Sequence, residues 1–335
     1  GIASFLIVMF SFIIPLSVDI DNQIASNNDS KINNSKKDFE KVLSGESIDD
    51  KEKVDEGLDL SNILEDVFKF DELPEDTVRL SASTIEQLFK DTNYSLSEVR
   101  RTKKVKPIRL SLLPNEMKSI ENSGKRKNLF IKIILPLVLE ENNRIIIDRK
   151  KLFTILNKNK NSKDEIKWLN QKFKQYGVVN KDLATLKVRM DIIPVSLAIA
   201  QAAKETGWGT SRFAIEGNAL FGQWTWSGEG IKPAGADTNA TYKVMKFNVL
   251  KASVRAYQRN LNTHSSYKKF RFIRAQLRDD NKKLDSLKLA EYLDNYAQTG
   301  TEYTKVLKQI IQQNQLKDFD EVKLLPLSVK YKNII

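Results

Sequence analysis

Residues 194–205, Pro-Val-Ser-Leu-Ala-Ile-Ala-Gln-Ala-Ala-Lys-Glu, are the part of the sequence that most constrains the fold. Proline is well tolerated in the first turn of a helix, so Pro194 marks the start of a helix that runs to about Glu205. This helix has few polar positions, and its alanines let neighbouring backbones approach closely. Since an apolar helix must be covered by other elements, the segment is predicted to lie buried at the centre of a helical domain.

Segments with the apolar spacing of helices lie on both sides of this one. They are residues 128–141, 149–158, 164–176, 182–190, 250–262 and, with a break, 287–315. Glycine, proline and aromatic residues crowd residues 207–235 instead. Residues 241–247 alternate like the returning strand of a hairpin that turns near 237–239. The sequence therefore predicts a mainly α-helical domain over residues 125–325 with a small β lobe.

The first 124 residues have a different composition. Residues 2–18 contain no charged residue, which is typical of a signal peptide or a membrane anchor and predicts export. Residues 19–76 are rich in Asn, Ser, Asp, Glu and Lys and are predicted to form a disordered linker, with a short helix at 61–70. Residues 77–124 are expected to be a helical and basic connecting region.

Composition limits the chemistry available to the chain. It has no Cys and a single His, so thiolate metal sites are excluded and a histidine-based site would depend on His264 alone. Carboxylates are then the expected acids and bases, and neither a metal nor a cofactor is predicted. The net charge of +12 favours a polyanionic partner, which could be nucleic acid, an anionic membrane surface or a wall polymer. Biased codon usage would account for the lysines equally well.

Glu205 is the candidate general acid. It ends the central helix and is followed by Thr-Gly-Trp-Gly. The negative end of the helix dipole disfavours a charged carboxylate, and the adjacent indole of Trp208 would exclude water. Both effects raise a carboxyl pKa, as a general acid working near neutral pH requires. The alternative is an ordinary exposed glutamate in a last helical turn, with Gly207 as the cap.

Aromatic residues cluster just after Glu205. Trp208, Trp224 and Trp226 lie close together in sequence, beside Phe213 and Phe221. Aromatic faces stack on the C–H faces of pyranose rings, so such a cluster in a glycine-rich segment favours a glycan cleft. An aromatic core is the competing interpretation.

Four motifs in order resemble glycoside hydrolase family 73, and its Bax-type subfamily in particular. Residues 195–214, with Gln-Ala-Ala-Lys-Glu-Thr-Gly-Trp-Gly, resemble the acid-bearing helix of that family. Residues 218–222, Asn-Ala-Leu-Phe-Gly, are similar to its Asn-Leu-Phe-Gly motif with one insertion. Residues 246–267 resemble the Bax-type sequences, and 295–303 resemble the late Tyr-Ala-x-x-x-x-Tyr motif. The resemblance covers about residues 152–314.

The resemblance implies a lysozyme-like α fold with a β lobe that cleaves peptidoglycan after N-acetylglucosamine. Glu205 falls on the catalytic acid of the family, and Tyr296 falls on the tyrosine that lines the cleft. The expected substrate-binding residues are Trp208, Asn218, Phe221, Trp224, Trp226 and Tyr303. A second carboxylate is less well placed: Asp237, near the predicted turn, is preferred over Glu229, although both could be surface acids.

Other interpretations remain open at the level of sequence. A lytic transglycosylase has the same fold but usually follows the acid with a Gly-Leu-Met-Gln-like stretch, which is absent here. A non-catalytic wall-binding or scaffold protein would keep the cleft without turnover. A nucleic-acid-binding protein would carry a recognisable DNA or RNA fold signature, and none is present. His264 is expected to satisfy a structural hydrogen bond. The predicted location is the periplasm or cell envelope, with residues 2–18 as an inner-membrane contact.

Overall fold

The computed structural model describes residues 60–69, 71–75, 77–225, 230–232 and 243–326. The chain divides into two compact units, whose described parts are residues 150–171 and, in the larger unit, residues 60–149 and 172–326. The predicted signal or anchor at residues 2–18 and most of the predicted linker lie outside the described residues. Within the part of the chain that the structure describes, no helix is both long and apolar enough to span a membrane.

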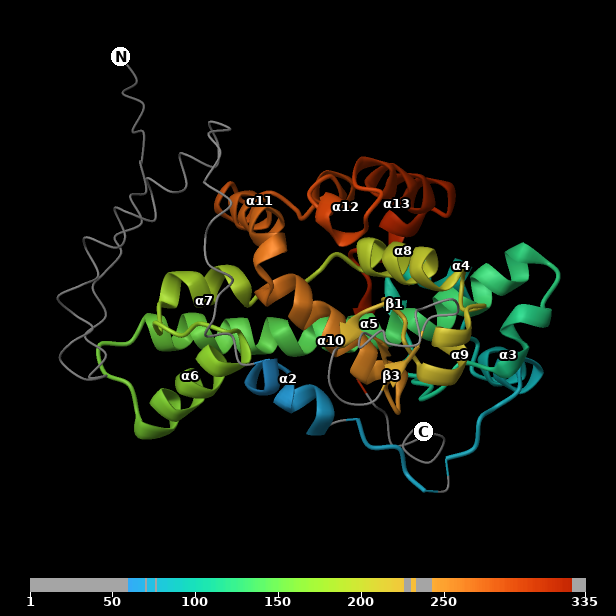
Figure 1. The fold of residues 1–335 in the computed structure, drawn as a ribbon, viewed down its shortest axis with the longest axis horizontal. Coiled ribbons are helices and arrows are strands. Elements are labelled where there is room, and N and C mark those ends of the chain that lie inside the picture. The colour runs from blue at the N-terminus through green and yellow to red at the C-terminus, as the bar shows by residue number, and fades with distance from the viewer. Residues whose placement is uncertain (1–59, 70, 76, 226–229, 233–242, 327–335) are drawn as a thin grey trace, which may run out of the picture. The chain divides into compact units, whose positions relative to one another are not determined.

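Helices dominate the larger unit, and its strands are short (Figure 1). The α-helices that lie wholly within it are α2 (Leu60–Lys69), α3 (Ala82–Asp91), α4 (Leu96–Thr102), α7 (Leu183–Arg189), α8 (Val195–Thr206), α9 (Arg212–Gly217), α10 (Leu250–Thr263), α11 (Lys268–Asp279), α12 (Ser286–Ala290) and α13 (Thr301–Gln313). Short 3-10 helices are η2 (Asn115–Ser119), η3 (Ser265–Tyr267), η4 (Asp294–Tyr296) and η5 (Leu316–Phe319). The predicted mainly α fold is confirmed.

The central helix is α8, as the sequence predicts. All of its residues are buried except Lys204 and Glu205 at its end. Helices α12, α13 and η5 pack against it, and its alanines permit this close approach. At its start, the Ser196 hydroxyl and amide both donate to the Asp320 carboxylate, each over 2.8 Å. These contacts fix the axis of α8 and therefore the position of Glu205.

The small β lobe is a three-stranded antiparallel sheet in the order β2-β4-β3. Its strands are β2 (Trp224–Thr225), β3 (Gly230–Ile231) and β4 (Lys243–Met245). Trp224 lies opposite Val244, and Gly230 lies opposite Met245. Strand β4 is the returning strand predicted at residues 241–247. A separate parallel pair joins β1 (Lys104–Val105) to β5 (Lys323–Leu324), two segments of the larger unit that are far apart in the sequence.

Helix α5 (Ser123–Leu156) is longer than the sequence predicts, because the two helices expected at 128–141 and 149–158 are continuous. The polar residues between them have buried partners and do not end the helix. The Asn142 side chain donates to the Ile193 carbonyl over 2.8 Å, and the fully buried Glu141 forms an ion pair with Arg255. Tertiary contacts thus outweigh a local sequence signal for a break.

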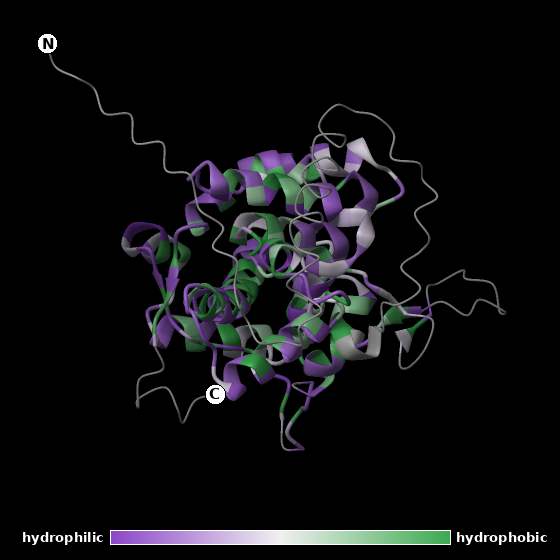
Figure 2. Ribbon diagram, turned by 90° about the vertical axis from the view of Figure 1, so that its left-hand side faces the viewer, coloured by the Kyte–Doolittle hydropathy of each residue, from purple (hydrophilic) through white to green (hydrophobic). Residues whose placement is uncertain are grey.

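Helix α2 is the short helix predicted at residues 61–70, and it packs against α10. Ile63 and Val67 are buried there, and Asp66 forms an ion pair with Arg259 over 2.9 Å. Hydrophobic residues gather on the inward faces of the helices, with hydrophilic residues toward the outside (Figure 2). The buried polar side chains of α10 are exceptions that are held by specific partners.

The smaller unit contains the end of α5 and the start of α6 (Lys163–Gln175). The Ser162 hydroxyl accepts a hydrogen bond from the Glu165 amide, and the Glu165 carboxylate accepts one from the Ser162 amide. This reciprocal cap lies at the start of α6, whose first residue is Lys163. Lys151 lies 4.8 Å from the ring centroid of Trp168 in the same unit.

Candidate active site

Glu205 lies in the last turn of α8, partly buried, and it accepts a hydrogen bond from Tyr303. Burial raises the pKa of Glu205 because it disfavours the charged form. The hydrogen bond from Tyr303 and the charge of Lys204 act in the opposite direction, but they only partly offset burial. The pKa of Glu205 therefore lies above its ordinary value, as a general acid requires.

The turn after Glu205 needs three consecutive residues in the left-handed region. Gly207, Trp208 and Gly209 have φ values of 57°, 62° and 83°. Gly207 is the helix cap, as in the competing interpretation, but Glu205 is not the exposed residue which that interpretation expects. The Trp208 amide donates to the Ala203 carbonyl over 2.9 Å. The Thr206 hydroxyl accepts from the Gly209 amide over 2.9 Å. This turn ends α8 one residue after the carboxylate and leads the chain sharply away from it.

Four tyrosines form a cluster beside Glu205, and three of them, Tyr267, Tyr296 and Tyr303, interact with its charge. Tyr303 comes from α13, Tyr296 from η4, Tyr267 from η3 and Tyr257 from α10. The rings of Tyr296 and Tyr303 stack with centroids 5.5 Å apart, and those of Tyr267 and Tyr296 are 5.9 Å apart. Burial, together with the Glu205 charge, raises the pKa of Tyr267 to about 12 and that of Tyr296 well above its usual value. These hydroxyls therefore stay protonated at neutral pH.

Phe221 and Gly222 bring the end of the Asn-Ala-Leu-Phe-Gly motif against this cluster. The Phe221 ring stacks on Tyr257 with centroids 3.8 Å apart, and its carbonyl accepts from the Tyr296 hydroxyl over 2.8 Å. Gly222 has a φ of 61°, and a Cβ atom built on it would lie 3.1 Å from Oε2 of Glu205. Glycine at this position keeps any side chain from covering that oxygen.

A pocket of about 520 Å³ borders the tyrosine cluster. It is lined by one stretch of chain, residues 294–301, which includes Tyr296. Asn295, Gln298 and Thr301 give this stretch exposed polar side chains. Tyr296 thus connects a polar hollow with the buried surroundings of Glu205.

Two further predicted substrate-binding residues, besides Phe221 and Tyr303, have structural contacts. Trp208 packs edge-on against Phe130, with centroids 5.9 Å apart, and Lys127 lies 5.1 Å from its ring. Asn218 is buried at the end of α9, where its Nδ2 donates to the carbonyls of Phe247 and Asn248. These contacts hold the segments that flank Glu205 in place. Sugar binding by either residue stays a prediction.

Several other predicted residues cannot be placed by their side chains. The backbone of Trp224 is in β2, but its side chain lies outside the described part of the structure, as do Trp226, Glu229 and Asp237 entirely. The second carboxylate therefore stays a prediction. His264 has the structural role expected for it, because its Nδ1 accepts a hydrogen bond from the Ser266 amide over 3.2 Å.

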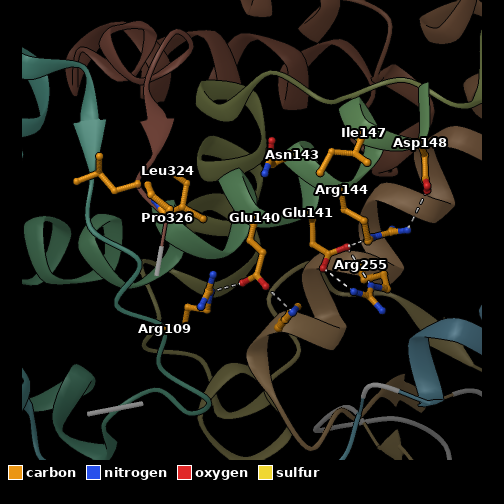
Figure 3. A pocket seen from close by; sticks show the side chains of 12 residues that line it. Arg109, Glu140, Glu141, Asn143, Arg144, Ile147, Asp148, Arg255, Leu324 and Pro326 are labelled. Atoms are coloured by element: carbon orange, nitrogen blue, oxygen red, sulfur yellow. Dashed lines mark hydrogen bonds and ion pairs between the residues drawn. The ribbon is translucent and has the colours of Figure 1, made fainter. Parts of the chain in front are cut away.

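A second pocket, of about 470 Å³, lies between α5 and α10 and is lined mainly by ion pairs (Figure 3). Glu140 accepts from Lys251 over 2.7 Å and contacts Arg109 at 2.5 Å. Burial raises the pKa of Glu141, but Arg255 and Arg144 outweigh it, so the pKa is lowered and this carboxylate stays charged. Among the described residues, Glu205 has no ion-pair partner. A general acid needs a carboxyl group that can hold a proton, so the site at Glu205 is favoured over the pocket between α5 and α10, whose carboxylates are paired with cations.

Comparison with known proteins identifies the family of the chain. Residues 180–316 match the glucosaminidase family, described as mannosyl-glycoprotein endo-beta-N-acetylglucosaminidase. Protein bax of Escherichia coli (strain K12) is 34% identical over 214 residues, which are 61% of this chain and 75% of that protein. The chain belongs to the glucosaminidase family. No solved structure matches it significantly.

The glucosaminidase segment contains Glu205 and all four tyrosines around it. Membership indicates a glycosidase-type hydrolase that acts on a glycan. Within the described residues, no group of three or more acidic or histidine side chains could hold a metal ion. Three residues of the site were not singled out from the sequence: Gln201, Tyr257 and Tyr267. Gln201 did carry a signal, because it precedes Glu205 by four positions on one face of α8.

Proposed function

We propose that this chain is a peptidoglycan N-acetylglucosaminidase of glycoside hydrolase family 73, with Glu205 as its general acid. The observation that carries the proposal is the environment of Glu205. Its carboxyl group is partly buried among protonated tyrosines, its pKa is raised, and among the described residues no cation pairs with it. Burial that raises the pKa of a carboxyl group makes it better suited to hold a proton and deliver it than an exposed carboxyl group would be.

In the proposed reaction, the Glu205 proton passes to the glycosidic oxygen as the bond to the anomeric carbon breaks. The bonding electrons stay on the leaving oxygen, and positive charge develops on the N-acetylglucosamine ring. Water then adds its oxygen to the anomeric carbon and gives up a proton. Asp237 is the proposed second carboxylate, with Glu229 as the less favoured candidate. If the N-acetyl group of the substrate assists instead, Tyr296 is the proposed helper.

Glycan recognition is proposed for the aromatic residues near the site. Trp208, Trp224 and Trp226 are the proposed sugar-stacking residues. The Phe221 ring is buried against Tyr257, so its proposed role, like that of Tyr303 and Asn218, is to hold the surrounding segments. The polar pocket at residues 294–301, which Tyr296 lines, suits hydroxyl and N-acetyl groups. The net charge of +12 favours an anionic wall over a neutral glycan.

A substrate in the cell wall requires the enzyme to leave the cytoplasm. We therefore propose that it acts in the periplasm or cell envelope and that residues 2–18, which carry no charge, direct its export or anchor it. Cell fractionation tests this directly. Recovery of the full chain in the cytoplasmic fraction alone would reject the proposed location.

The experiment that tests the proposed function compares Glu205→Gln with the wild-type protein on purified sacculi. Glutamine is nearly isosteric but has no proton to deliver, so we expect hydrolysis to fall by about 10²–10⁴-fold. Glu216→Gln, which changes an exposed glutamate on the neighbouring helix α9, is the matched control. A loss of less than about tenfold in Glu205→Gln would reject Glu205 as the general acid.

A further inference from the structure

Behind Glu205, a chain of hydrogen bonds runs through three helices. The Tyr257 hydroxyl of α10 donates to Oε1 of Gln201 over 2.6 Å. Nε2 of Gln201, on α8, donates to the Tyr303 hydroxyl over 3.2 Å. Tyr303, on α13, in turn forms a hydrogen bond with Glu205. The chain therefore ends on the carboxyl group that the proposed function depends on.

The interior members of this chain are shielded from water. Gln201 and Tyr257 are fully buried, and Tyr303 is 2% exposed. Tyr257 is also held by its stack on Phe221. Gln201 and Glu205 are four residues apart and so lie on the same face of α8. A buried amide with both of its ends in hydrogen bonds has little freedom to turn, because turning would leave polar groups unpaired.

The direction of each hydrogen bond follows from the groups involved. An amide nitrogen can only donate, so the Tyr303 oxygen accepts from Gln201 with a lone pair. The single hydrogen of the Tyr303 hydroxyl is then free to point to the Glu205 carboxylate. If the Gln201 amide were turned by 180°, Tyr303 would donate to Gln201 instead, and Glu205 would need its own proton to bond with Tyr303. The orientation of one amide therefore decides which form of Glu205 the tyrosine stabilises.

We propose that Gln201 is a positioning residue, which holds the Tyr303 hydroxyl with its hydrogen toward the Glu205 carboxyl group. This inference rests on the proposed function for its catalytic meaning. After Glu205 has given its proton to the leaving oxygen, the aligned hydroxyl stabilises the new carboxylate. The same bond keeps the proton affinity of Glu205 from rising as far as burial alone would take it.

Other groups around Glu205 do not replace this contact. Lys204, its neighbour on α8, lowers the proton affinity through its charge, but it is exposed. The charge of Glu205 raises the pKa of both Tyr267 and Tyr296, but the hydroxyls of these tyrosines have other partners. The Tyr267 hydroxyl bonds with the Asn260 side chain, and the Tyr296 hydroxyl donates to the Phe221 carbonyl. Gly222 lies over Oε2 and has no side chain. Gln201 can therefore orient the hydroxyl hydrogen of Tyr303 toward Glu205, because Gln201 donates to the oxygen of that hydroxyl.

The test is a carbon-13 NMR titration of Glu205 in the full-length protein, with the resonance assigned by its loss in Glu205→Gln. We expect Tyr303→Phe to raise the midpoint of the titration, because a donor to the carboxylate is removed. Gln201→Met, of similar size but without an amide, should raise it by less, because the hydroxyl loses its alignment. In the Tyr303→Phe background, Gln201→Met should add no further shift.

Two further variants keep the test decisive. Tyr94→Phe removes an equally buried hydroxyl that donates to the Lys132 carbonyl, and it should leave the Glu205 midpoint unchanged. If Gln201→Met does not fold, Tyr257→Phe keeps the ring on Phe221 while removing the first donor of the chain, and it should shift the midpoint upward. A downward shift in Tyr303→Phe, or no shift in either Gln201→Met or Tyr257→Phe, would overturn the proposal.

Activity gives a separate readout. In an active enzyme, the alkaline limb of the kcat/KM profile should move upward in Tyr303→Phe, by about one pH unit, which is typical of a lost hydrogen bond to a charged group. If the wild-type protein cleaves no glycan, the proposed function fails while the titration still tests the hydrogen-bond chain. If cleavage is normal but the midpoints do not move, the positioning role fails alone.

Discussion

Gly222 stands over the carboxylate of Glu205, so that a Cβ atom at position 222 would lie 3.1 Å from Oε2. This separation is shorter than an ordinary van der Waals contact. Its backbone, with a φ of 61°, also lies in the left-handed region that other residues adopt at a cost. Two independent constraints therefore favour glycine next to the proposed acid.

We predict that Gly222→Ala lowers turnover by at least about tenfold, because the new methyl group displaces the carboxylate, and small misplacements of a catalytic group are costly. Backbone strain should reduce the stability by about 1–2 kcal/mol. Gly177→Ala is the control, since Gly177 has a nearly equal φ of 62° but follows α6 and does not contact Glu205. Equal activity losses in both variants would show that strain, not contact with the acid, is responsible.

The raised pKa of Glu205 also predicts an effect on stability. A carboxyl group whose pKa is higher in the folded state costs no stability below its unfolded pKa, and the cost grows as pH rises through the folded value. Glu205→Gln removes this cost. The melting temperature of the variant, relative to wild type, should therefore rise as the pH is increased from about 4 to 8. A difference that stays constant over this range would contradict the raised pKa.

The buried ion pair of Glu141 and Arg255 predicts a large structural effect away from the site. Both side chains are almost completely buried and lie 2.8 Å apart. Arg255→Met leaves a buried carboxylate with Arg144 as its remaining close partner, and we expect it to destabilise the fold by about 3 kcal/mol. Lys305→Met, which breaks an exposed pair with Glu302, should cause no comparable change in urea denaturation. A small loss in Arg255→Met would mean that Arg144 alone compensates.

The proposed second carboxylate gives an ordered series of activities. Asp237→Asn should lower turnover more than Glu229→Gln does, but less than Glu205→Gln, because Asp237, near the turn predicted from the sequence, is the preferred candidate. The measurement is the initial rate of glycan cleavage under identical conditions. Rates near wild type for both variants would favour assistance by the N-acetyl group, in which case Tyr296→Phe should give the larger loss.

The sequence predicted the helix that carries Glu205 and its glycine cap because both depend on residues that are close together in the chain. Apolar spacing and the proline at the helix start are local signals, and the structure follows them. The merging of two predicted helices into α5 was not predicted, because the partners of Asn142 and Glu141 come from residues 51 and 114 positions away. Contacts at such separations leave no local pattern.

In the candidate site, too, local motifs were predicted and contacts between distant segments were not. The family motifs located Glu205, Tyr296 and Tyr303, and the structure brings the three together. The raised pKa of Glu205 was expected from the helix dipole and from the neighbouring Trp208, whose ring packs edge-on against Phe130. Burial among tyrosines from α10, η3, η4 and α13 raises that pKa, and their convergence depends on how four distant segments pack around α8.

The most direct test of the account is mass spectrometry of the fragments released from purified sacculi by the wild-type protein and by Glu205→Gln. We expect products with N-acetylglucosamine at the reducing end from the wild-type protein, and almost none from the variant. Products that end in 1,6-anhydro-N-acetylmuramic acid would identify a lytic transglycosylase instead. Equal release by both proteins would contradict the central claim that Glu205 is the general acid.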